Sequence, residues 1–263
     1  MFSVVIPARN RGRTTRDAIE AVFRQTFPPK EIIVVDDCSD IPLERELCQY
    51  LPRVTIVRLE KRSGVSAARN AGAAICSEKY IAFLDSDDLW LPDKCRIQIG
   101  AMVKRRWRAS HTDEHWFRKD RWVNQGKRHT KYGGYIFCQI LDKCRVSPSA
   151  FAVERDLFNH LGGFDELLTV CEDYEFFLRL ALETEIGYIP QKLTIKRAID
   201  ENSLSATIKH IESIRLEILE RFASQHEIPR EYAEDLRNEL ERKRKIVKME
   251  EDSSPTVINS ERL

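Results

Sequence analysis

Short apolar runs alternate with amphipathic stretches along the N-terminal part of the chain. The runs are rich in β-branched and aromatic residues and predict buried strands at 2–7, 31–35, 54–59 and 80–84. Between them, apolar positions recur at the spacing of a helix face, and prolines, serines and glycines mark the breaks. Alternating strands and helices of these lengths build a mostly parallel sheet with helices on both faces. We therefore predict an α/β fold with a Rossmann-like central sheet.

The C-terminal part of the chain is more helical in pattern. A strand is predicted at 147–153, a short helix at 155–161, and a longer helix that opens at Glu172. Residues 206–251 carry an apolar stripe followed by a heavily charged stretch, which predicts helices that pack on the body of the protein or on a partner helix. The last segment, 252–263, is polar and is predicted to be disordered.

Composition narrows the range of functions. The formal net charge of the 263 residues is +1, which argues against general nucleic-acid binding. The seven cysteines are odd in number and scattered without metal-ligand spacing, so we expect reduced, packing cysteines. No apolar run approaches the roughly 20 residues that span a bilayer, and the chain starts with a strand instead of a leader, so we expect a cytoplasmic protein. The basic run 104–131, which contains tryptophans, is better explained as a solvated face than as a binding surface.

Three carboxylates directly follow the strand predicted at 80–84. Asp85, Asp87 and Asp88 repel one another unless a cation neutralises them. In extended backbone Asp85 and Asp87 would point to the same face. An all-oxygen site of this kind suits Mg²⁺ or Mn²⁺ better than zinc. The alternative is a solvated acidic loop that precedes the next helix.

Polar residues also follow the other predicted strands. They lie at 7–10, at Asp36 and Asp37, and at 61–64. Ligands of parallel sheets bind beyond the carboxyl ends of the strands, where an acid can accept a hydrogen bond from a ribose hydroxyl or a base. The glycine fingerprint of dinucleotide folds and the P-loop are both missing, which disfavours a dehydrogenase or an ATPase. A diphosphate held by a metal fits the pattern better.

Four ordered blocks resemble the family 2 glycosyltransferases. They read VVIPARN at 4–10, IVVDDCSD at 33–40, GVSAARNAG at 64–72 and FLDSDD at 83–88. The resemblance covers about residues 2–205. It implies a GT-A fold, an inverting mechanism, a nucleotide-sugar donor, for which a UDP sugar is favoured, and Mg²⁺ or Mn²⁺ as cofactor.

The resemblance also implies roles by position. Asp87 would bind the metal directly, with Asp85 beside the ribose and the metal. A family histidine near the metal matches Asp200 here, and this departure leaves open whether Asp200 is a ligand or whether Arg197 contacts phosphate instead. The implied nucleotide-binding residues are Pro7, Ala8, Arg9, Asn10, Asp37, Gly64, Arg69, Asp85 and Ser86.

The family places its general base at the acidic pair that opens the helix near residue 172. This assigns the role to Asp173, with Glu172 as the near alternative. A competing explanation is local, because carboxylates at a helix N-terminus satisfy free N–H groups and favour the helix dipole. That environment also lowers a pKa, whereas a base gains from a raised one.

The expected organisation is a GT-A domain at 1–205, a helical extension at 206–251 and the tail. Within the domain, 1–103 would bind the nucleotide and 104–205 the acceptor, which is a glycan, a lipid-linked sugar or another hydroxyl compound. Peripheral contact with the inner face of the membrane and the oligomeric state stay open. A non-catalytic nucleotide-sugar-binding or scaffold protein and a sugar nucleotidyltransferase are the alternatives.

Overall fold

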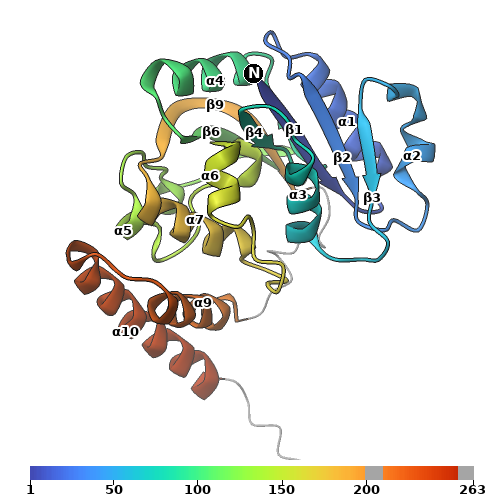
Figure 1. The fold of residues 1–263 in the computed structure, drawn as a ribbon. Helices are drawn as coiled ribbons and strands as arrows, with labels where there is room; N and C mark the ends of the chain where they lie inside the picture. Colours follow the sequence, from blue (N-terminus) through green and yellow to red (C-terminus); the bar gives the residue numbers. More distant parts are fainter. Residues whose placement is uncertain (199–209, 254–263) are drawn as a thin grey trace, which may run out of the picture.

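A computed structural model describes residues 1–198 and 210–253 (Figure 1). Its strands form one sheet in the order β3-β2-β1-β4-β8-β6-β9-β5, with β7 paired to β6. The strands are β1 (Phe2–Ala8), β2 (Glu31–Asp36), β3 (Thr55–Arg58), β4 (Tyr80–Phe83), β5 (Leu89–Trp90), β6 (Ala109–Arg118), β7 (Arg121–Val123), β8 (Phe151–Glu154) and β9 (Gly187–Ala198). The α-helices are α1 (Gly12–Phe23), α2 (Leu43–Glu46), α3 (Val65–Ala74), α4 (Lys94–Arg105), α5 (Phe137–Ile140), α6 (Arg155–His160), α7 (Glu172–Glu183), α9 (Ile211–Gln225) and α10 (Arg230–Ser253).

The N-terminal half of the sheet is parallel. Strands β3, β2, β1 and β4 lie side by side and run in the same direction. Strands β1, β2 and β4 are buried because helices cover both faces of the sheet there, whereas the edge strand β3 is partly exposed. Val5 packs in one core cluster with Ala68 of α3, and Val4 packs in the other with Ala18 of α1. The predicted sheet with helices on both faces is confirmed.

The strands after β4 extend the sheet largely with antiparallel pairs. Strand β8 is antiparallel to both β4 and β6, β9 runs parallel to β6, and the short β5 closes the edge beside β9. The strand predicted at 147–153 starts later, because Pro148–Ala150 form a 3-10 turn (η3) before β8. Proline has no backbone N–H to give to a strand ladder, which favours the turn at this point.

The C-terminal helices lie on the side of α5 and α7 (Figure 1). Phe222 of α9 and Leu236 of α10 are buried in the same core cluster as Phe137 of α5. The rings of Phe137 and Phe222 are 5.9 Å apart. Within residues 1–198 and 210–253, no helix combines the length and the apolar character needed to cross a membrane. The two helices therefore share the core of the sheet domain.

Two sequence predictions fall partly or wholly outside the described residues. Asp200 lies outside them, so its proposed role as a metal ligand has no structural counterpart here. The tail predicted at 252–263 also lies largely outside, although α10 continues to Ser253. The seven cysteines are all free thiols, as predicted.

Candidate functional site

The loops that follow β1, β2, β3 and β4 meet at the carboxyl edge of the parallel half-sheet, as parallel strands require. Pro7 and Ala8 are buried inside β1 itself, paired with Val35 and Asp36 of β2. Arg9 is half-buried and Asn10 is exposed beyond the strand. Of the predicted 7–10 segment, only these last two side chains therefore reach the edge.

Asp37 organises the loop between β3 and α3. Its carboxylate oxygens accept hydrogen bonds from the backbone N–H of Ser63 (2.6 Å) and of Gly64 (3.0 Å). Gly64 has a φ of 92°, a left-handed conformation in which glycine is favoured. The side chain of Asp37 is 5% exposed. Asp37 thus fixes the loop, and the remaining lone pairs of its oxygens could still accept from a nucleoside.

Arg69 of α3 bridges two of the predicted site residues. Its Nη2 donates to Asp85 Oδ1 at 2.7 Å, and its Nη1 donates to Glu172 Oε1 at 2.8 Å. Arg69 is 3% exposed. Burial works against its charged form, but the two carboxylates outweigh burial and raise its pKa. The guanidinium therefore ties the loop after β4 to the N-terminus of α7.

The pKa values of the two carboxyl groups at this bridge, Asp85 and Glu172, shift in opposite directions. Burial alone would raise the pKa of Asp85, but Arg69 and Lys196 hold it below its ordinary value. The pKa of Glu172 is raised, mainly by burial and also by neighbouring Asp173, despite the pull of Arg69. Asp85 is thus kept ionised, whereas Glu172 is held as a charge-paired, poorly solvated carboxylate.

The acidic triplet forms a turn instead of an extended strand. The N–H of Asp88 donates to the carbonyl of Asp85 at 3.0 Å, so the backbone reverses around Ser86 and Asp87. The prediction that Asp85 and Asp87 share a strand face fails for this reason: Asp85 contacts Arg69, while Asp87 pairs with Arg11. Burial and the nearby Asp85 charge raise the pKa of Asp87, against the effect of Arg11.

Ser149 of η3 supports this turn from the second half of the chain. Its Oγ accepts from the Asp85 N–H at 3.1 Å and donates to Asp88 Oδ2 at 2.6 Å. Asp88 also accepts from the Arg197 N–H at 2.8 Å, and Arg197 Nε donates to the Asp87 carbonyl at 2.6 Å. Ser149 was not predicted, because no motif marks it. Arg197, expected as a phosphate contact, is turned toward the acidic loop.

A half-buried lysine on β9 was not predicted either. Lys196 lies near Glu114, Asp88, Asp85 and Asp173, whose charges raise its pKa although burial opposes the charged form. Glu114 in turn pairs with Lys131 at 3.2 Å, and both are more than nine-tenths buried. In the sequence, Lys196 is only a lysine among apolar strand residues. A lysine in a strand is also typical of a sheet edge, so its position alone does not indicate a functional site.

Asp173 lies in the first turn of α7, next to Glu172. Its Oδ1 accepts from the Tyr174 N–H at 2.7 Å, and its side chain is half-buried. Within the described ranges, no cation lies at ion-pair distance from it, in contrast to Glu172. The residue before the helix, Cys171, has a left-handed φ of 58°, which is costly for a non-glycine residue and is typical of positions held by function or by packing.

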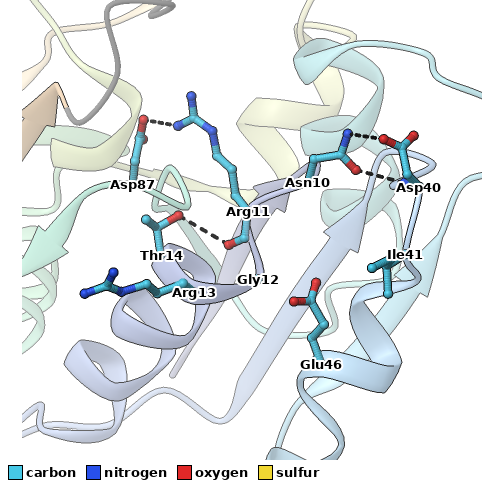
Figure 2. A pocket seen from close by; sticks show the side chains of 9 residues that line it. All are labelled: Asn10, Arg11, Gly12, Arg13, Thr14, Asp40, Ile41, Glu46 and Asp87. Carbon is cyan, nitrogen blue, oxygen red and sulfur yellow. Dashed lines mark hydrogen bonds and ion pairs between the residues drawn. The ribbon is translucent and has the colours of Figure 1, made fainter.

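A cavity of about 520 Å³ opens beside the ends of β1 and β2 (Figure 2). Figure 2 shows Arg11 reaching Asp87 at one end and Asn10 paired with Asp40 at the other. Of the predicted site residues, Asn10 and Asp87 line this cavity, whereas Asp37 and Arg69 do not. The structure therefore brings the predicted set to one edge of the sheet but divides it between the cavity and the Arg69 bridge.

The donor set at the acidic turn is compatible with a magnesium-type cation. Asp85 and Asp87 supply hard carboxylate oxygens. The pKa of Asp87 is raised first by burial and then by the like charge of Asp85, a repulsion that a cation would relieve. The described residues contain no group of three or more His, Cys, Asp or Glu side chains placed to hold a metal. Mg²⁺ commonly takes one or two carboxylates and completes its shell with water and substrate phosphates. The residues present fit a cation of that kind.

Comparison with known proteins gives consistent matches. The model of the glycosyl transferase family 2 matches residues 3–161. An uncharacterized glycosyltransferase of Rickettsia conorii is 32% identical over 195 residues, which cover 73% of this chain and 32% of that protein. The UDP-Glc:α-D-GlcNAc-diphosphoundecaprenol β-1,3-glucosyltransferase WfgD of Escherichia coli is 25% identical over 190 residues, 72% of this chain and 73% of that protein. The chain thus spans about a third of the length of the Rickettsia relative.

Among solved structures, the S. aureus protein TarS, residues 1–349 in complex with UDP-GlcNAc, superimposes with a TM-score of 0.77. The sequences are 18% identical, and the match covers 92% of this chain and 72% of that one. At this identity the likeness concerns the fold alone. It confirms the predicted mixed α/β fold class with its largely parallel central sheet.

Proposed function

The chain belongs to glycosyl transferase family 2, and from this premise we propose that it transfers a sugar from a UDP-linked donor to an acceptor hydroxyl with inversion at the anomeric carbon. The named relative WfgD uses a UDP sugar, and the structural neighbour TarS was crystallised with one. Both observations favour uridine as the nucleoside. The fold of the half-sheet that would carry the nucleotide is shared with TarS.

The observation that carries the proposal is the Arg69 bridge. It joins Asp85, on the side expected to hold the donor, to Glu172, next to the expected base. One buried guanidinium thereby holds the two halves of the site at a fixed separation. Such pre-organisation is what a displacement between two bound substrates needs.

We assign Asp173 as the general base and Glu172 as its positioning neighbour. Glu172 already forms an ion pair with Arg69, whereas Asp173 has an oxygen outside its local bond to Tyr174. In the reaction, Asp173 takes the proton of the acceptor hydroxyl, and the oxygen forms its bond to the anomeric carbon. The bond from that carbon to the diphosphate oxygen breaks, and the nucleoside diphosphate leaves with the electron pair.

Asp87 and Asp85 would hold the Mg²⁺ or Mn²⁺ ion, with Asp200 as a third candidate beyond the described residues. When bound, this cation supplies positive charge that stabilises the departing diphosphate. Arg11 pairs with Asp87 and neutralises its charge at the turn. Arg11 would compete with a bound cation for Asp87, and a guanidinium displaced from Asp87 would be suited to a donor phosphate.

The remaining assignments extend the same scheme. We propose that Arg9, Asn10, Asp37, Gly64 and Ser86 shape the nucleoside pocket, with Pro7 and Ala8 acting through the end of β1. Residues 1–103 would form the donor half and 104–205 the acceptor half, with 206–251 completing the acceptor side through its packing on α5 and α7.

The decisive experiment compares Asp173→Asn with the native enzyme. The amide keeps an oxygen that can accept from Tyr174 but cannot take a proton, so turnover of UDP-glucose or UDP-GlcNAc with Mn²⁺ should fall at least about 100-fold, while UDP affinity and melting temperature stay unchanged. Asp156→Asn is the matched control, because Asp156 also lies in the first turn of a helix and its side chain is 89% exposed.

Full activity of Asp173→Asn would rule out the base assignment. UDP-sugar binding by the native protein without hydrolysis or transfer, across donors and metals, would favour a non-catalytic nucleotide-sugar-binding protein. Release of pyrophosphate from a nucleoside triphosphate would favour a nucleotidyltransferase.

A further inference from the structure

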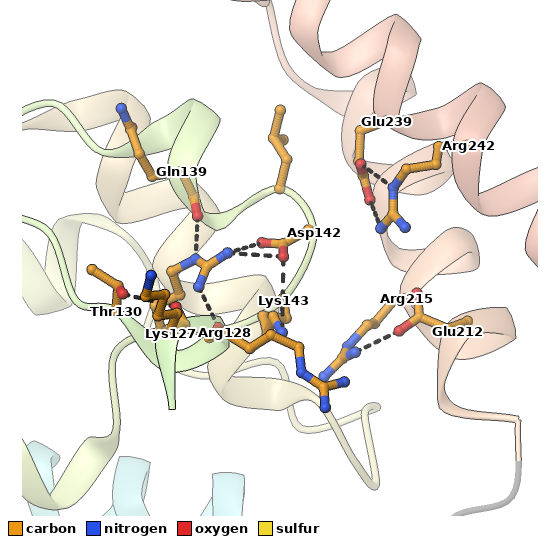
Figure 3. A network of polar contacts seen from close by, with 12 residues as sticks. Lys127, Arg128, Thr130, Gln139, Asp142, Lys143, Glu212, Arg215, Glu239 and Arg242 are labelled. Atoms are coloured by element: carbon orange, nitrogen blue, oxygen red, sulfur yellow. Dashed lines mark hydrogen bonds and ion pairs between the residues drawn. The ribbon is translucent and has the colours of Figure 1, made fainter. Parts of the chain in front are cut away.

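Three cationic side chains gather between the second half of the sheet domain and α9. Arg128 belongs to the 3-10 turn η2 (Lys127–His129), Lys143 follows α5, and Arg215 lies on α9. Figure 3 shows their charged ends directed toward one region. We call these three residues the cation cluster.

The carboxylates around the cation cluster are largely engaged with other partners. Asp142 binds Arg145 through both oxygens, at 2.9 and 2.8 Å, and is 4.0 Å from Lys143 Nζ. Glu212 contacts Arg215 Nη1 at 2.6 Å but also accepts from the fully buried Lys243 Nζ at 2.6 Å. In the part of the chain that the structure describes, Arg128 has no ion pair. Positive charge is therefore in excess.

The pKa values of Lys143, within the cation cluster, and of His129, beside it, are both lowered, and the nearby positive charges contribute to this. Burial and then the charges of Arg145, Arg215 and Arg128 lower the pKa of Lys143, although Asp142 opposes them. The pKa of His129 is lowered in the same way, first by burial and then by Lys143 and Arg128. Cations that are crowded together without enough carboxylates are stabilised when an anion binds among them.

The cation cluster also lies next to the helix that carries the expected base. Arg215 lies near the thiol of Cys171. Burial and then Asp173 raise the pKa of that thiol to about 11, while the charge of Arg215 lowers it. Cys171 immediately precedes Glu172 and Asp173 at the start of α7. The acidic turn, where the donor diphosphate is expected, is instead served by Arg11, Arg69 and Arg197. An anion at the cation cluster would therefore belong to the acceptor side.

We propose that the cation cluster of Arg128, Lys143 and Arg215 is a binding subsite for a phosphate group of the acceptor, so that the acceptor is a phosphate-bearing saccharide or polyol. This rests on the proposed transferase function and adds a substrate class to it. Arginine offers paired N–H donors that match phosphate oxygens, and lysine adds a mobile point charge. The bound phosphate would hold the acceptor near the N-terminus of α7. The acceptor hydroxyl would then be free to approach Asp173.

Binding of a simple phosphate ester tests the subsite directly. Phenyl phosphate is titrated calorimetrically into native protein saturated with UDP and Mg²⁺, so that the donor site is filled. Saturable binding is expected, and Arg128→Gln and Lys143→Gln should each weaken it about tenfold, with UDP affinity unchanged. Lys104→Gln, an exposed lysine on α4, is the control and should bind like the native protein.

Arg128 is the cleanest variant, because its side chain is exposed and forms no ion pair among the described residues. Arg215→Gln also removes the bond to Glu212, so its binding data are read together with its melting temperature. No saturable binding in the millimolar range, or equal binding by Arg128→Gln and Lys143→Gln and the native protein, would overturn the proposal. So would binding that UDP abolishes, because the phosphate would then occupy the donor site.

Competition distinguishes the source of the phosphate. Displacement of phenyl phosphate by a short alkyl diphosphate sugar supports a lipid-linked acceptor, and displacement by a glycerol phosphate oligomer supports a phosphodiester polymer. Displacement by neither compound refutes the subsite. Asp173→Asn should retain phenyl phosphate binding, so a failure of the base assignment and a failure of the subsite give different results.

Discussion

Replacing Arg69 by methionine should destabilise the protein more than any other single change at the proposed site. Arg69 is 3% exposed and donates to Asp85 at 2.7 Å and to Glu172 at 2.8 Å. Methionine fills much of the same space but leaves two poorly solvated carboxylates without a partner. Removing one member of a buried charge network typically costs about 3–5 kcal/mol.

The size of the effect follows from the two bonds. A hydrogen bond between charged groups contributes about 1.5–3 kcal/mol, so two of them give about 3–6 kcal/mol, which overlaps with that range. For a chain of this length the melting temperature should fall by roughly 10 °C. Arg69→Lys keeps the charge but cannot reach both carboxylates in a fork, so an intermediate loss is expected.

The pH dependence provides a second signature. Asp85 has a lowered pKa in the folded state, so its contribution to stability is present above its ordinary value of 3.8 and is lost as pH falls through the lower, folded value. In Arg69→Met that contribution disappears, and the stranded carboxylates are relieved by protonation. The stability difference between the native protein and the variant should therefore be greatest near neutral pH and should narrow in acid.

Urea denaturation from pH 7 to about pH 3 measures this difference, because the range then extends below the ordinary pKa of Asp85. Glu172→Gln and the double variant complete a cycle, in which a coupling of at least about 1 kcal/mol is expected because the two side chains are in direct contact. Arg96→Met is the control, since its ion pair with Asp93 is exposed and should contribute little to stability. A loss below about 1 kcal/mol for Arg69→Met, or strict additivity with Glu172→Gln, would refute the bridge.

Two further predictions concern the core. Burial lowers the pKa of Lys94 from 10.5 to about 8, which corresponds to about 3 kcal/mol, and its ammonium stacks on Trp90 at 3.7 Å, a contact worth about 1 kcal/mol. Lys94→Met should therefore stabilise the protein by about 2 kcal/mol below pH 8, and the gain should fade as pH rises toward 10.5. Urea denaturation across this pH range tests the prediction, and a gain that is independent of pH would contradict it. Phe222→Ala should cost about 3–5 kcal/mol in the same assay, whereas Leu167→Ala, at a residue 87% exposed, should cost little; equal losses would mean that α9 does not share the core.

The first half of the fold could be predicted because its signals are local. Continuous apolar runs, turn residues and the strand-helix rhythm specify β1 to β4 and the helices between them. Strands β1, β2 and β4 are buried on both faces, whereas the edge strand β3 is partly exposed. The acidic residues could be predicted because they directly follow these apolar runs in the sequence. The pairing of β8 with β4 and β6 and of β9 with β6 joins segments that are distant in sequence, and no comparable pattern in the chain marks it.

The sequence predicted which residues belong to the site, but not which of them contact one another. Motif blocks pointed to Asp85, Arg69 and Glu172, yet nothing in their spacing indicated that one guanidinium would contact both carboxylates. The turn after Leu84 separated Asp85 from Asp87, which extended backbone would have kept together. Ser149 and Lys196 were missed because their importance arises from neighbours that are distant in sequence.

The contacts of Ser149 bear on the design of chimeras between relatives. Its hydroxyl is one of the links, beside Arg197, through which the later half of the chain holds the acidic turn of the earlier half. A chimera that joins the front of one family member to the back of another should keep a small side chain that can both donate and accept at this position. Without it, the grafted turn would lose two of its hydrogen bonds.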